Sequence, residues 1–207
     1  NFELVRDMLR FRDSGGESLV KGGQVVVEKL LDEAAQSLTN RRFEFPATEA
    51  DFREILGVSY TALGQFRKAK ENLSRTLEIR EKAGGPKSAG VADALHNLAA
   101  AMFQNGEYEQ AYVNYQRSFA IRRGVHKGDD KDVAFSLTHL AACEMKFGKY
   151  DEAERNYREA LDMRRRLYPG DHEDVAASLN NLAKLYMERE NGAAAEPPFR
   201  QSLEMIR

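Results

Sequence analysis

The chain has little of what several classes of protein require. Its 207 residues include a single cysteine, Cys143, and no tryptophan, which excludes an internal disulfide and favours a reducing compartment. No apolar run approaches the roughly 18 residues that a membrane span needs, and no charged-then-apolar leader opens the chain. We therefore expect a soluble, cytoplasmic protein.

The chain also lacks a large excess of either positive or negative charge. The 31 Lys and Arg residues nearly balance the 33 Asp and Glu residues, so no basic field predicts binding to nucleic acid or to an anionic membrane. The four histidines have no partners at metal-ligand spacing. A glycine-rich phosphate loop and the H-R-D and D-F-G motifs of kinases are missing as well. We expect no metal, no cofactor, no catalytic residue and no enzymatic activity.

The chain does contain one sequence pattern that occurs four times. Stepping by 42 residues gives the same leucine in each copy, followed each time by glycine or alanine: Leu56, Leu98, Leu140 and Leu182. Within a copy, apolar residues recur at helical spacing in two stretches, and glycine separates the stretches in three copies. Each copy is therefore predicted to be a helical hairpin.

The pattern predicts an all-α superhelix of about ten helices. Four hairpins are expected at residues 51–87, 88–129, 130–171 and 172–207. Their helices are expected near residues 51–63, 66–82, 88–104, 108–123, 131–147, 150–167, 173–189 and 193–207.

The first 50 residues depart from the repeat and are predicted to be a helical cap or linker. A short amphipathic helix is expected over residues 2–9, then a flexible connection that includes Lys21-Gly22-Gly23. A longer helix is expected over residues 25–41, covering the apolar end of the first hairpin, and Pro46 opens the next helix. A strand over residues 25–27 is the alternative, because β-branched residues are poor helix formers. The inward residues of the longer helix would be Leu30, Leu31, Ala34 and Leu38.

The third and fourth copies deviate from the common pattern. Glu190 replaces the turn glycine, and Pro197 and Pro198 fall in the early turns of the last helix, where a kink is expected. Glu144 occupies a position that is apolar or aromatic in the other copies. Either the helix rotates there, or the carboxylate reaches an Arg or Tyr neighbour.

Two features that suggest chemistry have simpler interpretations. His139 and Cys143 are four residues apart, which would place an imidazole beside a thiol, but the other copies have small or apolar residues at the position of Cys143, so packing is favoured. Arginine runs that end the second helices, Arg122-Arg123 and residues 164–166, complement the helix dipole. Helix capping and solvated surface are favoured for these runs over a binding patch.

The small residues at the helix crossing, the Gly and Tyr at the turn, and the Ala followed by an aromatic on the second helix resemble the tetratricopeptide repeat. The common unit has about 34 residues; a 42-residue unit with V-A-x-S-L-N-N-L-A and G-x-Y-x-E-A-E is similar to the kinesin light chain type. The N-terminal F-E-L-V-R-D-M-L and V-V-V-E-K-L-L-D-E-A-A resemble the region that follows the kinase domain in some bacterial serine/threonine kinases.

The resemblance implies that the first helices of the hairpins line a concave groove that binds a protein or peptide partner. An Asn in the groove can donate to and accept from an extended peptide backbone. The alternative is that Asn97 and Asn181 bond neighbouring helices within the superhelix. The predicted groove residues are His96, Asn97, Phe103, Thr138, His139, Met145, Lys146, Asn180, Asn181, Lys184 and Met187.

We therefore predict a protein-interaction scaffold, a fragment of a larger signalling protein, that contacts neither nucleic acid nor membrane. One alternative is the regulatory C-terminal region of a bacterial serine/threonine kinase acting in cis. The other is a self-associating repeat module, a homo-oligomer formed through an uncovered C-terminal end. That end would expose Leu182, Tyr186, Phe199 and Leu203.

Overall fold

All regular secondary structure in the described part of the chain is helical. The computed structural model describes residues 17–39, 43 and 45–206, and no strand occurs among them. The predicted all-α fold is confirmed, and the expected helix over residues 2–9 lies outside the described residues. The helices are α2 (Glu17–Thr39), α3 (Pro46–Ala62), α4 (Phe66–Gly84), α5 (Ala89–Gln104), α6 (Tyr108–Val125), α7 (Lys131–Lys146), α8 (Tyr150–Leu167), α9 (Glu173–Glu188) and α10 (Gly192–Met205).

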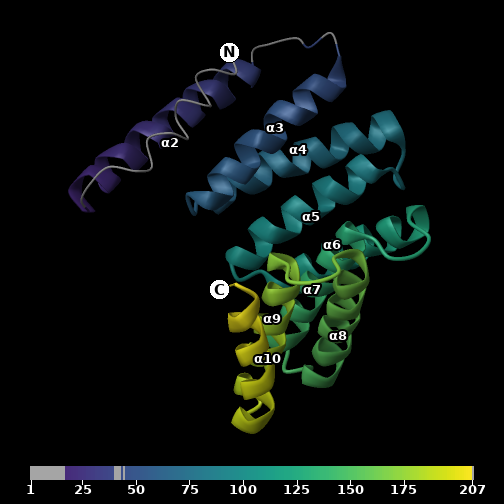
Figure 1. Ribbon diagram of the computed structural model, residues 1–207. Coiled ribbons are helices and arrows are strands. Elements are labelled where there is room, and N and C mark those ends of the chain that lie inside the picture. Colours follow the sequence, from purple (N-terminus) through teal and green to yellow (C-terminus); the bar gives the residue numbers. More distant parts are fainter. Residues whose placement is uncertain (1–16, 40–42, 44, 207) are drawn as a thin grey trace.

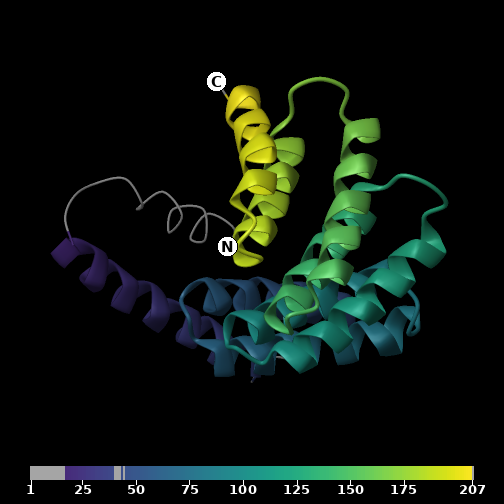
Figure 2. The same cartoon turned by 90° about the horizontal axis from the view of Figure 1, so that it is seen from below.

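Consecutive helices pair into four hairpins, α3–α4, α5–α6, α7–α8 and α9–α10, and each hairpin packs on the next (Figure 1). The predicted ends of the hairpin helices agree with the observed ones to within two residues, except that α3 begins before residue 51, at Pro46, where a helix start was also predicted. Proline suits this position because the first turn of a helix does not use its backbone N–H. Helix α2 begins at Glu17, eight residues before the predicted start at residue 25. Figure 2 shows that α9 and α10 stand across the direction of the N-terminal helices.

The turn of each hairpin is closed by the same pair of backbone hydrogen bonds. In the first, Gly64 N–H donates to Thr61 O (3.0 Å) and Gln65 N–H donates to Tyr60 O (2.9 Å), which is the Schellman motif. This motif needs a left-handed residue, and Gly64 has φ of 72°. The fourth hairpin keeps both hydrogen bonds, but its left-handed residue is Glu190, with φ of 56°.

Small residues let the two helices of a hairpin approach closely. Gly57 of α3 lies against α4, and a Cβ on it would be 2.4 Å from Leu73 Cγ. At the same register in the later hairpins, Ala99, Ala141 and Ala183 have no measurable exposure. The small residue that follows the leucine in each 42-residue repeat thus allows the two helices of the hairpin to cross closely.

Helix α2 packs against the N-terminal hairpin. Leu31 and Leu38 join a core cluster with Leu56 and Tyr60, and α2 packs against α3 (Figure 1). One prediction was wrong here, because residues 21–23 are helical instead of flexible. Residues 25–27 are helical, as the main interpretation predicted, so the alternative of a strand is excluded. Glycine costs a helix only about 1 kcal/mol relative to alanine, so a helix that packs well can continue through it. Ala34, predicted to face inward, is exposed.

The last helix runs through both of its prolines. Because α10 begins at Gly192, Pro197 and Pro198 lie beyond its first turn. Each therefore removes a backbone hydrogen bond from the helix. Among the described residues, no helix has the length and apolar character to cross a membrane.

Candidate functional site

Side chains of α3, α5, α7 and α9 meet on one surface of the array, which we call the first-helix face. Asn97 Nδ2 of α5 donates to Glu54 Oε1 of α3 (2.9 Å), a residue 43 positions earlier. One hairpin further along, the rings of His96 and His139 have the same separation in sequence, and their centroids are 4.7 Å apart. Positions 43 residues apart, one residue more than the repeat, are therefore neighbours on this face.

The predicted groove residues differ in exposure. His96 is buried, with 5% of its surface exposed. Lys146, Lys184 and Met187 are exposed. The others are half-buried, namely Asn97, Phe103, Thr138, His139, Met145, Asn180 and Asn181.

The middle of the first-helix face is an aromatic cluster of His96, His139, Tyr115 and Phe135. His96 stacks on Phe135 (centroids 4.6 Å apart), and His139 stacks on Tyr115 (5.1 Å). Burial lowers the pKa of His96 to about 2 and that of His139 to about 4. His96 Nδ1 is buried without a hydrogen-bond partner among the described residues. Both imidazoles are therefore neutral at pH 7.

The asparagines fall into two groups. Asn97 is engaged within the array through Glu54, so for this residue the structural interpretation holds. The side-chain amides of Asn180 and Asn181 have no hydrogen bond to any described residue, and both residues are half-buried. Their amides keep free donors and acceptors at the C-terminal end of the face.

The predicted apolar positions are also unequal. Phe103 contacts Tyr108, with ring centroids 5.2 Å apart, and packs against the core of the second hairpin. Met145 packs against the core between the third and fourth hairpins. Met187 is 55% exposed. Of these three side chains, Met187 is the one that offers substantial apolar surface.

An arginine that recurs every 42 residues is the feature that the sequence interpretation missed. Arg80, Arg122 and Arg164 each lie near the C-terminal end of a second helix. Arg122 Nη1 donates to Ser136 Oγ (2.8 Å), and Arg164 Nη1 donates to Ser178 Oγ (2.5 Å), so each joins the following first helix. The prediction of solvated charge is wrong for Arg122 and Arg164, which are both 7% exposed. The recurrence of arginine at the same position of successive repeats was the sequence signal for these contacts.

Two of these arginines are neutralised by carboxylates. Arg80 donates Nη1 to Glu54 Oε1 (2.8 Å) and Nη2 to Glu54 Oε2 (2.7 Å). Arg122 Nη2 donates to Asp93 Oδ1 (2.8 Å). Arg164 has no carboxylate oxygen within 4.0 Å among the residues that the structure describes. Burial lowers the pKa of Arg164.

A family model for the tetratricopeptide repeat matches residues 50–124, 91–166 and 132–207. The chain belongs to the tetratricopeptide repeat family. The model covers all four hairpins, which agrees with the repeat read from the sequence. A comparison with curated proteins finds no match. No comparison bears on the resemblance to bacterial kinases, which stays a prediction.

Solved tetratricopeptide structures share the fold. BtubC (BKLC) from P. vanneervenii is 22% identical with a TM-score of 0.74, over 91% of this chain and 75% of its own. A kinesin light chain-like protein with nearly identical repeats from Podosopora anserina is 21% identical with a TM-score of 0.71, over 90% and 88%. A Rap protein complexed with Competence and Sporulation Factor is 14% identical with a TM-score of 0.71, over 90% and 50%. At these identities the likeness establishes the fold.

The contacts between successive tetratricopeptide hairpins explain Glu144. Its carboxylate accepts hydrogen bonds from Tyr112 OH (3.3 Å) and Asn156 Nδ2 (2.7 Å), so the predicted tyrosine neighbour is confirmed. Burial raises the pKa of Glu144. At the next interface the two residue types are reversed, because Tyr186 OH of α9 donates to Glu154 Oε1 of α8 (2.9 Å).

Cys143 packs inside the tetratricopeptide array. It has no measurable exposure, and burial raises the pKa of its thiol to about 12. A thiol in this state is not a nucleophile at neutral pH, which agrees with the packing interpretation. Within the described ranges, no three His, Cys, Asp or Glu side chains gather as metal ligands.

Proposed function

We propose that this array is a protein-interaction scaffold that binds a short, extended segment of a partner protein on the first-helix face. The observation that carries the proposal is the pair of neighbouring side-chain amides of Asn180 and Asn181, which lie on half-buried residues and have no hydrogen bond to a described residue. A peptide backbone offers the matching donors and acceptors whatever its sequence.

The dimensions of the face suit a short ligand. Helices that pack about 9 Å apart place the outer two of four first helices roughly 27 Å apart. An extended peptide rises about 3.3 Å per residue and covers that distance in about eight residues. The exposed Lys146, Lys184 and Glu188 mix both signs of charge, which argues against a strongly charged partner. The Rap structure, a complex with Competence and Sporulation Factor, supports ligand binding by this fold.

The test begins with peptides selected from a random library on the wild-type chain. Asn181→Ala should weaken their binding by about 1 to 2 kcal/mol, or roughly fivefold to thirtyfold, because one side chain supplies both a donor and an acceptor. Its melting temperature should not change, since the side chain of Asn181 has no hydrogen bond to a described residue that the substitution would break. Fluorescence titration and thermal melts measure the two effects.

Asn97→Ala is the matched control. It should lower the melting temperature by about 2 to 4 °C, because it removes the amide that donates to Glu54. Normal binding by Asn181→Ala, or a loss of binding that only follows unfolding, would rule out the proposed role of that residue. Regulation in cis within a larger signalling protein and self-association both stay predictions.

A further inference from the structure

A cavity opens between α8, α9 and α10, at the last two hairpins of the array. Its volume is about 670 Å³, within the range of about 300 to 1,000 Å³ that is typical of small-molecule sites. Leu161 of α8 and Leu179 and Leu182 of α9 line it and are otherwise buried. The base of the cavity is therefore apolar.

This cavity lies on the side of α9 that faces away from the first-helix face. Leu179, Leu182 and Tyr186 of α9 line the cavity, whereas Asn180 and Lys184 belong to the first-helix face. Successive residues of a helix are turned by about 100°, so Leu182 and Lys184 point about 160° apart. A molecule bound in the cavity would therefore leave the first-helix face free.

The cavity exists because α10 has shorter side chains than the second helix before it. In the third hairpin, Asn156 Nδ2 of α8 donates to Glu144 Oε2 of α7 (2.7 Å) and so closes the space between the two helices. One repeat later these positions hold Pro198 and Tyr186, and both line the cavity. Proline has no side-chain amide to donate. Ala194, also in the lining, replaces a glutamate of α8.

An ion pair between successive second helices loses its carboxylate at this cavity. Arg123 of α6 pairs with Glu159 of α8. One repeat later the same two positions hold Arg165 and Gln201, and Arg165 Nη2 donates to Gln201 Oε1 (3.0 Å). The amide keeps a hydrogen bond to the guanidinium but does not neutralise its charge. Both residues line the cavity.

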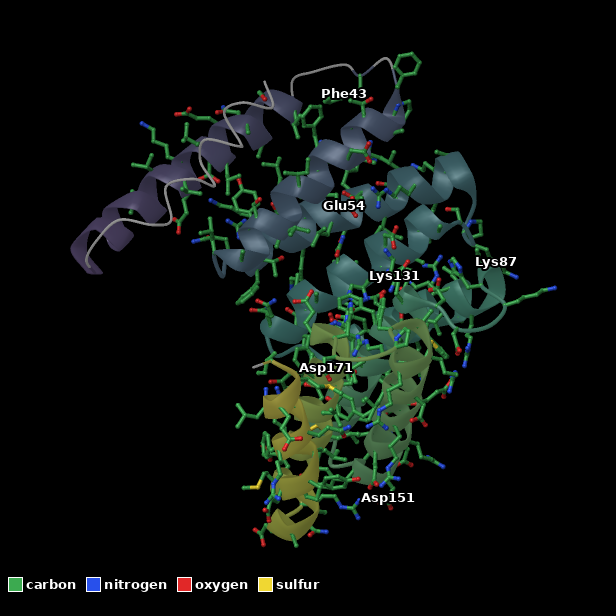
Figure 3. All side chains as sticks on the ribbon, in the orientation of Figure 1. Phe43, Glu54, Lys87, Lys131, Asp151 and Asp171 are labelled. Atoms are coloured by element: carbon green, nitrogen blue, oxygen red, sulfur yellow. The ribbon has the colours of Figure 1, made fainter. Side chains whose placement is uncertain are left out.

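The other two arginines of the cavity have close carboxylate partners. Arg158 Nη2 lies 2.8 Å from Glu154 Oε1, and Arg189 Nη1 lies 3.0 Å from Glu154 Oε2. Arg189 Nη1 is also 3.0 Å from an oxygen of Asp151, which Figure 3 labels at the start of α8. These two guanidinium groups are therefore neutralised within the chain.

Arg165 differs from them in being both accessible and weakly paired. Its side chain is 43% exposed, and its Nη1 is 4.0 Å from Oδ1 of Asp162, whose side chain is 60% exposed. An exposed pair of this kind contributes little, because water screens it. Ala194 precedes Gln201 by seven residues on α10, a rise of about 10 Å. The cavity therefore has a positive charge at one end and extends about 10 Å from it along α10.

We infer that this cavity binds a small molecule with an apolar body and one carboxylate. The carboxylate accepts hydrogen bonds from Arg165, in place of the glutamate that pairs with the equivalent arginine one repeat earlier. The apolar body covers the three leucines and the two prolines of α10. This site is separate from the first-helix face and does not depend on the proposed function.

The direct probe is sodium octanoate, titrated into the chain with ¹³C-labelled leucine methyl groups at constant ionic strength. The signals of Leu161, Leu179 and Leu182 should shift in a saturable manner, while Leu137, buried in the third hairpin, should not respond. Absence of a saturable shift at the three cavity leucines would overturn the inference.

Two further probes separate the parts of the ligand. Acetate carries the charge without the apolar body, and octanamide carries the apolar body without the charge. Each should bind at least about tenfold more weakly than octanoate. Equal binding of octanamide would refute the role of the carboxylate, and equal binding of acetate would refute the role of the apolar body.

Arg165→Gln removes the positive charge at the end of the cavity. It should weaken octanoate binding roughly tenfold to a hundredfold and make octanamide bind as well as octanoate. Arg166→Gln is the matched control, because Arg166 pairs with Asp129 (2.6 Å) and is outside the cavity lining. Unchanged octanoate affinity in a folded Arg165→Gln chain would contradict the assignment.

Ala194→Leu fills the cavity without removing a contact of the wild-type chain. It should abolish the octanoate response, and leucine is well tolerated in a helix. Ala193→Leu, at the exposed neighbouring position outside the cavity lining, should leave the response unchanged. An Ala194→Leu chain that binds octanoate as the wild type does would show that the ligand lies elsewhere.

The peptides selected on the wild-type chain distinguish this site from the proposed function. Their affinity should not change when octanoate is saturating, because the two surfaces lie on opposite sides of α9. Competition between octanoate and the peptides would refute the separate site. If octanoate binds and no peptide does, the inferred site stands and the proposed function fails. If peptides bind and octanoate does not, the proposed function stands and the inferred site fails.

Discussion

His96 and His139 are kept neutral by the aromatic rings around them. Burial lowers both pKa values, to about 2 and about 4, below the value of about 6.5 of an unfolded histidine. The folded state therefore binds fewer protons than the unfolded state between these values. The stability that the neutral histidines contribute is complete above pH 6.5 and is lost as the pH falls from 6.5 toward their lowered pKa values. His96 and His139 interact, so they titrate as a pair.

We expect the free energy of unfolding to fall between pH 6.5 and 4.5, and His139→Phe to flatten this slope. A depression to about 4 corresponds to about 3 kcal/mol of stability that depends on neutral His139. Urea unfolding at several pH values measures the slope. Glu144 acts in the opposite direction because its pKa is raised.

His126→Gln is the control, because His126 lies at the end of α6, outside the aromatic cluster. It should leave the slope in place. A wild-type chain equally stable at pH 7 and 4.5 would show that the histidines are not held neutral.

Among the helices, hydrophobic spacing predicted most of the boundaries, because each hairpin buries one stripe of each helix against its neighbour. The first-helix face was predictable only in outline. The roles of Asn97 and Arg164 depend on partners 43 and 14 residues away and on which face of the helix each occupies. The sequence therefore predicts which helices form the site, and the structure is needed to separate internal contacts from free groups.

The turn between α9 and α10 is strained at Glu190, whose φ is 56° where the other hairpins have glycine. A left-handed conformation costs a residue with a Cβ roughly 1 to 2 kcal/mol. Glu190→Gly should therefore raise the stability by about 1 kcal/mol and the melting temperature by about 2 to 4 °C. Calorimetry measures both values.

Gly148→Ala provides the reverse experiment, since Gly148 has φ of 71° in the third hairpin. It should lower the stability by about 1 to 2 kcal/mol. If Glu190→Gly destabilises the chain, the glutamate side chain supplies a contact that outweighs the strain.

At the scale of the whole molecule, the C-terminal end of the array exposes apolar side chains on and beside α10. Phe199 is 39% exposed, Leu203 52% and the adjacent Ile206 63%. The sequence interpretation also expected Leu182 and Tyr186 to be uncovered, but Leu182 is 5% exposed and Tyr186 is half-buried. The fourth hairpin covers its first helix more fully than the pattern implied.

We expect this surface to make the chain self-associate weakly as its concentration rises, because repeat arrays bury their apolar ends. Leu203→Glu should return it to a monomer. Val113→Glu, at a side chain of α6 that is 62% exposed, should leave the association unchanged. Sedimentation velocity over a range of concentrations tests this, and a monomer throughout would contradict it.

The reversed pairs Tyr112–Glu144 and Glu154–Tyr186 constrain how such an array can evolve. Repeats are gained and lost when recombination joins equivalent positions. Losing residues 130–171 would remove both glutamates and set Tyr112 against Tyr186 with no carboxylate between them. Duplicating that unit would instead bring Glu154 of one copy against Glu144 of the next, two acids in a half-buried place where like charges repel. Loss or duplication of the third unit would therefore break the Tyr–Glu pairing with its neighbours, although its backbone would fit at any place in the array.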